Sequence, residues 1–442
     1  MTNNPLAQNF GFRSLLAFAF PTISMMLFMG LYTIIDTIFI ARFVNTNALS
    51  AINIVCPLLN LMVGLATMVA TGGSAVVARR MGSNDMEKAK QAFTLIISFG
   101  LMLGIVIMVV GITWLDSIVY ALGADDILFP YCKEYIKVIL LFAPASMLQV
   151  LFQSLFVTAG KPTLGLVLSV CAGVMNILFD YVFMVPCDMG ISGAGLGTGL
   201  GYLIPAMGGI LYFSGSRETL SFVKPVFDYR VLIESCVNGS SEMVSQLSTA
   251  VTTFFFNAIM MRLLGVSGVA SITIIIYTQF VMTTLYIGFS MGIAPIFSYQ
   301  DGARNYPMLH KVYLISVTCI LISSLFIYLL SIGSASHFIQ LFTKENKEVF
   351  HITVQGFHLF AISFLFSGFN IYSSSLFTAL SNGKLSALIS FLRTFGLLLP
   401  FLLFLPEAMG LHGVWLAVPL AEAVTLCLSL FLNYRLWCSW SS

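Results

Sequence analysis

Repeated apolar runs, each long enough to cross a bilayer, constrain this sequence more than any other feature. A helix needs about 20 mostly apolar residues to span the hydrocarbon core. Runs of that order fall at about 14–41, 48–77, 91–114, 134–158, 163–185, 190–213, 232–261, 267–297, 309–332, 349–379, 385–405 and 411–436. Membrane β-strands are about ten residues long and alternate in polarity, which these runs do not. The sequence therefore predicts an all-α integral membrane protein with twelve transmembrane helices.

Composition excludes several other classes of protein. Apolar residues make up 58% of the chain and charged residues 9%, against about 25% charged in soluble domains. A net charge of +2 is too small to favour nucleic acid as a partner. The eight cysteines form no CxxC pair, so neither a zinc site nor a disulfide framework is expected. The polar N-terminus lacks a small-residue cleavage site, and we expect no removable signal peptide.

The distribution of Lys and Arg predicts how the chain is oriented. With the N-terminus inside, thirteen of these cations fall at the cytoplasmic ends of the spans and six at the opposite ends. Only Arg393 lies within a predicted span. Because cytoplasmic loops are enriched in Lys and Arg, we expect a multi-pass protein of the cell inner (plasma) membrane with both termini in the cytoplasm.

The chain also repeats itself. A shift of 220 residues aligns Gly72 with Gly292 and Gly82 with Gly302. Farther along, the same shift aligns the block containing Pro186, Gly190 and Gly193 with the block containing Pro406, Gly410 and Gly413. Each half holds six spans, so both halves face the same way. We therefore predict two parallel, pseudo-symmetric six-helix lobes, 1–213 and 230–442, joined by a cytoplasmic linker at 214–229. Such parallel repeats are typical of transporters.

Ionisable side chains inside spans mark candidate functional residues, because they cost roughly 2.5–3.5 kcal/mol each to insert. Asp36 and Asp180 lie near the outer ends of the first and fifth helices. Asn176 shares a helix face with Asp180 through i,i+4 spacing, and Thr198 on the sixth helix lies at the same depth. The C-terminal repeat has no acid at either equivalent position, so the scaffold does not require this pair.

Two neighbouring carboxylates in a low-dielectric site cannot both ionise cheaply. One of them can therefore carry a proton across the membrane. The same oxygens, with those of Asn176 and Thr198, could instead coordinate a small hard cation such as Na+ at Asp36 and Asp180. The coupling ion, H+ or Na+, stays open, and no other cofactor or structural metal is expected. A purely structural role, as polar contacts between helices, is the alternative.

Three further features of the spans each allow more than one interpretation. Glu242 lies in the seventh helix among Asn and Ser residues, where a role in C-lobe coupling or substrate binding and a structural role are both open. Glu422 and Arg393 are expected to be interhelical partners or headgroup contacts, rather than to take part in transport. Pro21 removes a backbone hydrogen bond from the first helix, which permits either a hinge or a static bend.

A glycine-rich run at 193–201 invites a nucleotide-binding interpretation. The spacing fails the GxGxxG pattern, and no strand precedes it. Close packing of helices through small residues explains the run better. The chain has no GxxxxGK[ST] motif either, so ATP hydrolysis by this chain is not expected.

The chain resembles the multidrug and toxic compound extrusion (MATE) family, in its prokaryotic DinF-like branch, over essentially its whole length. The resemblance is carried by Pro21 and Asp36 in helix one, Asn176 and Asp180 in helix five, and Thr198 in helix six. These residues stand at the spacing that the branch uses for its N-lobe cation site. Helix ten, FNIYSSSLFTAL, has no aspartate, unlike the branch that binds sodium in the C-lobe.

The resemblance implies a cation-coupled antiporter. Entry of protons or sodium would drive export of amphipathic, often cationic, drugs or toxic organic compounds by alternating access. The expected partners are these small molecules and the lipid bilayer, with no nucleic acid, and the protein is expected to act as a monomer. It is expected to be a secondary active transporter, not an enzyme.

Other functions are less compatible with the residues. A lipid-intermediate flippase of the same superfamily would need a cationic cavity, whereas the charges inside these spans are mostly acidic. A membrane-embedded enzyme would need a motif such as HExxH or GxSxG in the right context. A passive channel would need neither the duplication nor the paired acids.

Overall fold

A computed structural model describes residues 4–44, 46–215, 219–343 and 347–441, and every regular element in this part of the chain is a helix. Apolar residues favour this outcome in a membrane because a helix satisfies its backbone hydrogen bonds internally. The helices of the N-terminal half are η1 (Pro5–Ala7), α1 (Phe12–Phe43), α2 (Thr46–Gly82), α3 (Met86–Thr113), α4 (Leu115–Ala121), α5 (Phe129–Leu141), α6 (Ala143–Thr158), α7 (Pro162–Met184) and α8 (Gly190–Gly215).

The C-terminal half begins with an unusually long element. Its helices are α9 (Tyr229–Gly302), α10 (Tyr306–Thr343), α11 (Lys347–Phe360), η2 (Ala361–Ser363), α12 (Phe364–Ala379), α13 (Gly383–Phe391), η3 (Leu392–Gly396), α14 (Leu398–Met409) and α15 (Leu411–Ser441). The 74 residues of α9 would extend about 110 Å as one rod, several times the thickness of the hydrocarbon core. The break is at Gly265, which has the left-handed φ of 62°, so α9 contributes two spans.

The predicted twelve crossings are recovered once broken helices are counted correctly. Ten helical stretches of the described chain are long and apolar enough to cross a membrane, counting Lys347–Ala379 and Gly383–Met409 as one stretch each, and α5 with α6 forms a further span bent by 56°. Dividing α9 at Gly265 supplies the twelfth. The all-α, twelve-span prediction is thereby confirmed. Of the predicted linker, residues 216–218 lie outside the described part of the chain.

Three predicted spans are not continuous helices, which the apolar runs do not reveal. The fourth bends at Phe142, where Pro144 opens α6 and cannot donate the hydrogen bond that would continue α5. The tenth contains the 3₁₀ turn η2, and the eleventh contains η3, a π-helical turn that includes Arg393. Such π turns inside helices are frequent at functional sites.

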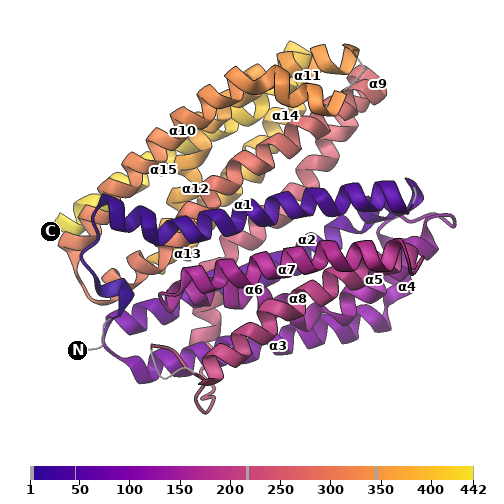
Figure 1. Cartoon of the computed structure of the whole chain (residues 1–442). Helices are drawn as coiled ribbons and strands as arrows, with labels where there is room; N and C mark the ends of the chain where they lie inside the picture. The colour runs from indigo at the N-terminus through magenta and orange to yellow at the C-terminus, as the bar shows by residue number, and fades with distance from the viewer. Residues whose placement is uncertain (1–3, 45, 216–218, 344–346, 442) are drawn as a thin grey trace.

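Figure 1 shows the two halves as separate groups of helices, with α1 running along the boundary between them. This helix packs against α7 of its own half and against α9 of the other half. Around Pro21 its backbone approaches the second part of α9: a Cβ at Gly288 would lie 2.8 Å from the Cα of Ile23. Helix α1 therefore touches both lobes.

At one end of the boundary between the two halves, two equivalent backbone contacts hold the halves together. A Cβ added at Gly82 would lie 1.9 Å from the carbonyl oxygen of Tyr299, and one at Gly302 would lie 2.0 Å from that of Arg79. These four residues form two pairs related by the 220-residue shift. Arg79 also pairs with Asp301, with 3.2 Å between Nε and Oδ2. Backbone contact at this end is thus as close as glycine allows.

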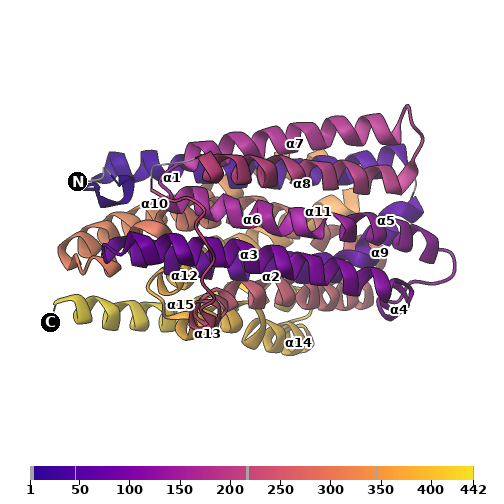
Figure 2. The same cartoon turned by 90° about the horizontal axis from the view of Figure 1, so that it is seen from below.

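The chain termini lie at that same end of the molecule (Figures 1 and 2). The segment before α1 is tied to the C-terminal half, because the side chain of Gln300 donates to the carbonyl of Leu6 over 2.9 Å. Lys311 likewise donates to the side chain of Asn9 over 2.6 Å. Termini at one end are what an even number of crossings requires.

Candidate functional site

The two predicted aspartates meet where α1 packs against α7. The carboxyl groups of Asp36 and Asp180 lie within hydrogen-bonding reach of each other, and the side chain of Asp180 is buried, with 1% exposed. Their juxtaposition depends on the packing of α1 on α7, which sequence spacing alone does not determine. The structure therefore brings together the pair on which the predicted coupling site rests.

These carboxyl groups have no partner that neutralises them. Among the described residues, no side-chain or backbone donor reaches Oδ1 of Asp36 or either carboxylate oxygen of Asp180, and all three atoms are buried. A buried carboxylate without a donor is costly. Two such groups facing each other can form a hydrogen bond only when one of them is protonated. The arrangement is suited to taking up a proton or a cation.

Asp180 is deeply buried because α8 presents glycines to α7 and can pack closely against it. A Cβ at Gly197 would lie 2.0 Å from Oδ1 of Asp180, and one at Gly201 would lie 3.3 Å from the Cβ of Asn176. The alternate glycines face the other way: a Cβ at Gly199 would lie 2.1 Å from the ring of Phe142. The glycine-rich run therefore serves close helix packing, as predicted, and it forms one wall of the acidic site.

The remaining predicted residues of the site lie beside the pair. The amide of Asn176 donates to the hydroxyl of Thr198 at 3.4 Å, which joins α7 to α8. Oδ1 of Asn176 is buried and receives no hydrogen bond from the described residues, so it is a further oxygen available to a cation. Asp36, Asp180, Asn176 and Thr198 thus form one cluster in the N-terminal lobe.

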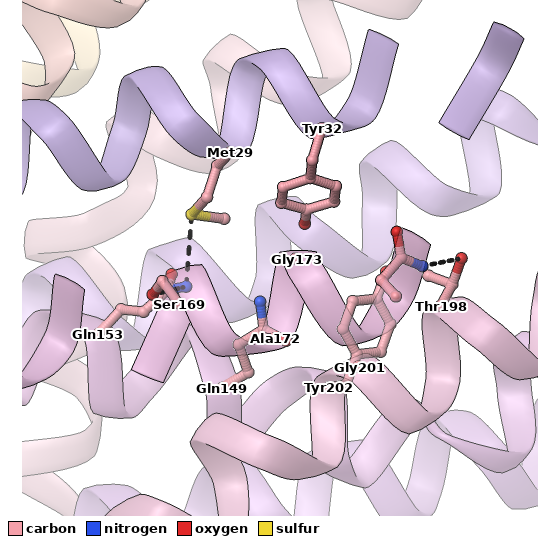
Figure 3. Close-up of a pocket in the computed structure, with 11 residues that line it drawn as sticks. Met29, Tyr32, Gln149, Gln153, Ser169, Ala172, Gly173, Thr198, Gly201 and Tyr202 are labelled. Carbon is pink, nitrogen blue, oxygen red and sulfur yellow. Dashed lines mark hydrogen bonds between the residues drawn. The ribbon is translucent and has the colours of Figure 1, made fainter. Parts of the chain in front are cut away.

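A narrow cavity continues from Asn176 and Thr198 between α1, α6, α7 and α8 (Figure 3). Its lining includes Tyr32, Gln149 and Tyr202. The space open to the centre of a water molecule is about 10 Å³, close to what a single water requires. In this conformation the cavity admits water or a small ion and excludes a drug-sized molecule.

Sequence reasoning missed the polar residues of this wall. In Figure 3 the ring of Tyr32 reaches from α1 toward Gly173 on α7. Gln153 donates to the hydroxyl of Ser169 over 3.2 Å and also contacts the sulfur of Met29. Tyr32 lies one turn before Asp36, so i,i+4 spacing could have indicated it. Nothing in the sequence distinguishes the two glutamines of α6.

Pro21 lies within α1, which remains a single helix from Phe12 to Phe43. Beside it, a Cβ at Gly292 of α9 would lie 3.1 Å from the Cα of Ala19. The proline is thus in the part of α1 that packs on the C-terminal lobe, whereas Asp36 is in the part that packs on α7. The choice between hinge and static bend stays a prediction.

The predicted partnership of Arg393 and Glu422 is confirmed. Nη2 of Arg393 lies 2.6 Å from Oε1 of Glu422. Glu242 is half-buried on α9, and its charge is within electrostatic range of Arg393. A role of Glu242 in C-lobe coupling or substrate binding stays a prediction.

Both halves of the chain match the same protein family. The family model MatE matches twice, over residues 21–182 and 243–404. Together the two segments cover well over half of the chain, and the second begins 222 residues after the first. The duplication inferred from the 220-residue shift is confirmed by this double match.

Individual relatives match the chain from end to end. The multidrug export protein MepA of Staphylococcus haemolyticus is 24% identical over 433 residues, covering 96% of this chain and 94% of the relative. A crystal structure of MATE in complex with MaL6 superposes with a TM-score of 0.94 at 20% identity and 100% coverage of both chains. The outward-facing conformation of a multidrug resistance MATE family transporter of the MOP superfamily superposes with a TM-score of 0.93 at 20% identity, covering 100% of this chain and 99% of that one.

Proposed function

The chain belongs to the MatE family, and from that premise we propose that it is a cation-coupled antiporter that exports amphipathic, often cationic, organic compounds. Members of this family are secondary transporters, not enzymes. The proposal places the protein in the plasma membrane with both termini in the cytoplasm, as its Lys and Arg distribution favours. Export of drugs by the MepA relative supports this class of substrate.

One observation carries the proposal: Asp36 and Asp180 lie side by side, and three of their four carboxylate oxygens are buried with no donor among the described residues. Removing one negative charge, by a proton or by Na+, relieves the repulsion between the two carboxylates. The same oxygens, with Oδ1 of Asn176, are the hard ligands that Na+ prefers. Both ions therefore remain candidates at the same site.

Ion uptake can act on the lobes through α1. Asp36 is on the half of α1 that faces α7, and the half near Pro21 packs on α9 of the other lobe. A change in how tightly α1 docks on α7 therefore alters its contact with the C-terminal lobe. We propose that a proton or Na+ arriving from outside binds at the aspartates, that α1 shifts, and that the substrate leaves before the lobes rock to the inward-facing state.

The driving force is sufficient for accumulation against a gradient. One positive charge that moves inward down the membrane potential releases about 2.3 kcal/mol per 100 mV, which is roughly a 50-fold concentration ratio. Exchange of one external cation for one neutral substrate could use all of it. Exchange for a monovalent cation would instead use the ion's own concentration gradient.

Uptake into proteoliposomes tests the proposal. Purified protein, reconstituted with ethidium as the probe, is exposed to a pH gradient and to a sodium gradient in separate experiments. We expect one gradient to drive ethidium transport and the other to have little effect. No transport under either gradient, together with scrambling of a labelled anionic lipid, would favour the flippase alternative and overturn the proposal.

A further inference from the structure

The C-terminal lobe contains a buried acid that already has a cation. Glu422 on α15 is 3% exposed. Arg393 donates to it from Nη2 and Nε, over 2.6 and 3.1 Å to Oε1. Asn370 on α12 donates to Oε2 over 2.7 Å. Both carboxylate oxygens therefore receive charged or polar donors, in contrast to those of Asp180.

The internal repeat places this pair at the position of the N-lobe site. At a shift of 220 residues Glu422 corresponds to Tyr202, which lines the cavity beside Asn176 and Thr198. Tyr202 is also within electrostatic range of Asp36. The two clusters thus occupy corresponding places in the two lobes. Among the described residues, no basic side chain pairs with the carboxylates of the first cluster, whereas the carboxylate of the second is paired with Arg393.

We propose that Arg393 is a tethered counter-ion that keeps Glu422 from exchanging a proton or Na+ during transport, so that all ion coupling occurs at the N-lobe aspartates. This inference rests on the proposed function. An arginine side chain stays charged in proteins, and here Nη2 and Nε both donate to Oε1 of Glu422 in charge-assisted hydrogen bonds. It cannot leave the site, as a diffusible ion must at the end of each cycle.

The groups around the pair are consistent with this role. Arg393 is in the π-helical turn η3, and Glu242 on α9 is the second acid within range of its charge. The hydroxyl of Tyr286, also on α9, is within electrostatic range of Glu422. Loss of the Arg393 side chain would therefore leave the carboxylate of Glu422 with only the amide of Asn370 among its described side-chain donors.

Removing that charge is the sharpest experiment. The quantity to measure in proteoliposomes is the coupling ratio, the number of ions moved per ethidium molecule. It is obtained from the ion gradient at which a fixed ethidium gradient produces no net transport. Arg393→Gln is expected to raise this ratio, up to a doubling, because Glu422 must then take up a proton or Na+ of its own. An active Arg393→Gln protein with the wild-type ratio would overturn the inference.

A neutral double variant provides the matched control and covers a failure to fold. Arg393→Gln with Glu422→Gln removes both charges, and neutral replacement of buried ion pairs is often tolerated. The double variant is expected to keep the wild-type ratio. If it lost coupling, Glu422 would be a coupling residue and the inference would be wrong. Loss of coupling in Asp36→Asn tests the proposed function independently, since that variant leaves Arg393 and Glu422 unchanged.

Discussion

Asp180 in the N-terminal lobe and Glu422 in the C-terminal lobe are both nearly inaccessible, at 1% and 3% exposed. Their surroundings differ. Asp180 faces a second acid and a wall of glycine, with no donor to either carboxylate oxygen from the described residues. Glu422 receives Arg393 and Asn370. The same duplicated scaffold therefore supports one buried acid with no donor among the described residues and one that is paired with an arginine.

The helices α8 and α15, which correspond in the two lobes, also differ in the residues that they place near the two acids. At a shift of 220 residues, Gly197 of α8 corresponds to Ala417 of α15, and Thr198 corresponds to Val418. Glycine allows the backbone of α8 to touch the carboxylate of Asp180, whereas α15 carries a side chain at the equivalent place. The glycine contact with a buried carboxylate is thus a feature of the N-terminal lobe, although the fold is common to both.

The largest effect is expected from removing the acids of the N-lobe. Asp180→Asn and Asp36→Asn should each reduce efflux to the level of cells without the protein. The asparagine side chain can neither take up and release a proton in this pH range nor supply the negative charge that a carboxylate offers to Na+. Cellular drug resistance and proteoliposome uptake measure this. Unaltered thermal unfolding in detergent would show that the variants still fold, and normal resistance from either would contradict the coupling role.

A smaller but still large effect is expected at Gly197. An added methyl would lie 2.0 Å from Oδ1 of Asp180, so Gly197→Ala must displace the carboxylate or separate α8 from α7. Overpacking of this kind costs about 1–3 kcal/mol, and we expect transport to fall about tenfold or more. The reverse change in the other lobe, Ala417→Gly, is the control and should leave transport near wild type, with stability lower by about 1 kcal/mol.

Stability, in contrast to transport, should be more sensitive in the C-lobe. Glu422→Gln leaves the guanidinium of Arg393 without its carboxylate, and breaking a buried pair in this way costs about 3–5 kcal/mol. The thermal unfolding midpoint in detergent should fall clearly, and the additional change Arg393→Gln should restore most of it. Asp180→Asn should not lower the midpoint, since it leaves no cation unpaired. Equal losses from Glu422→Gln and Asp180→Asn would remove the distinction between the lobes.

The smallest effect is expected from Thr198→Val, which gives α8 the residue that α15 has at Val418. The hydroxyl of Thr198 accepts a long hydrogen bond of 3.4 Å from Asn176, worth about 1 kcal/mol. The ion concentration for half-maximal transport should rise roughly fivefold, with maximal transport unchanged. Val418→Thr, its counterpart, should leave both quantities unaffected.

Helix number and the duplication were predictable from sequence, because both depend on local composition. For Arg393 and Glu422 the sequence left interhelical pairing and headgroup contact open, and the structure shows the pair. The breaks within spans were not predicted. Pro144 could have indicated the bend at Phe142, but nothing in the residues of η3 marks a π-helical turn. Tyr32 could have been indicated by its i,i+4 spacing from Asp36, whereas nothing in the sequence distinguishes Tyr202 among the sixteen tyrosines. Their place beside the aspartates arises from tertiary packing.

The contact of Gly82 with the carbonyl of Tyr299, and of Gly302 with that of Arg79, is self-complementary. In a symmetric homodimer, the surface patch that one subunit presents is the patch that it receives. The joined halves of this chain retain that geometry at their tightest point, as two copies of a six-helix ancestor would before fusion. The buried acids of the two halves therefore differ around an interface at which each half presents a glycine to a backbone carbonyl of the other.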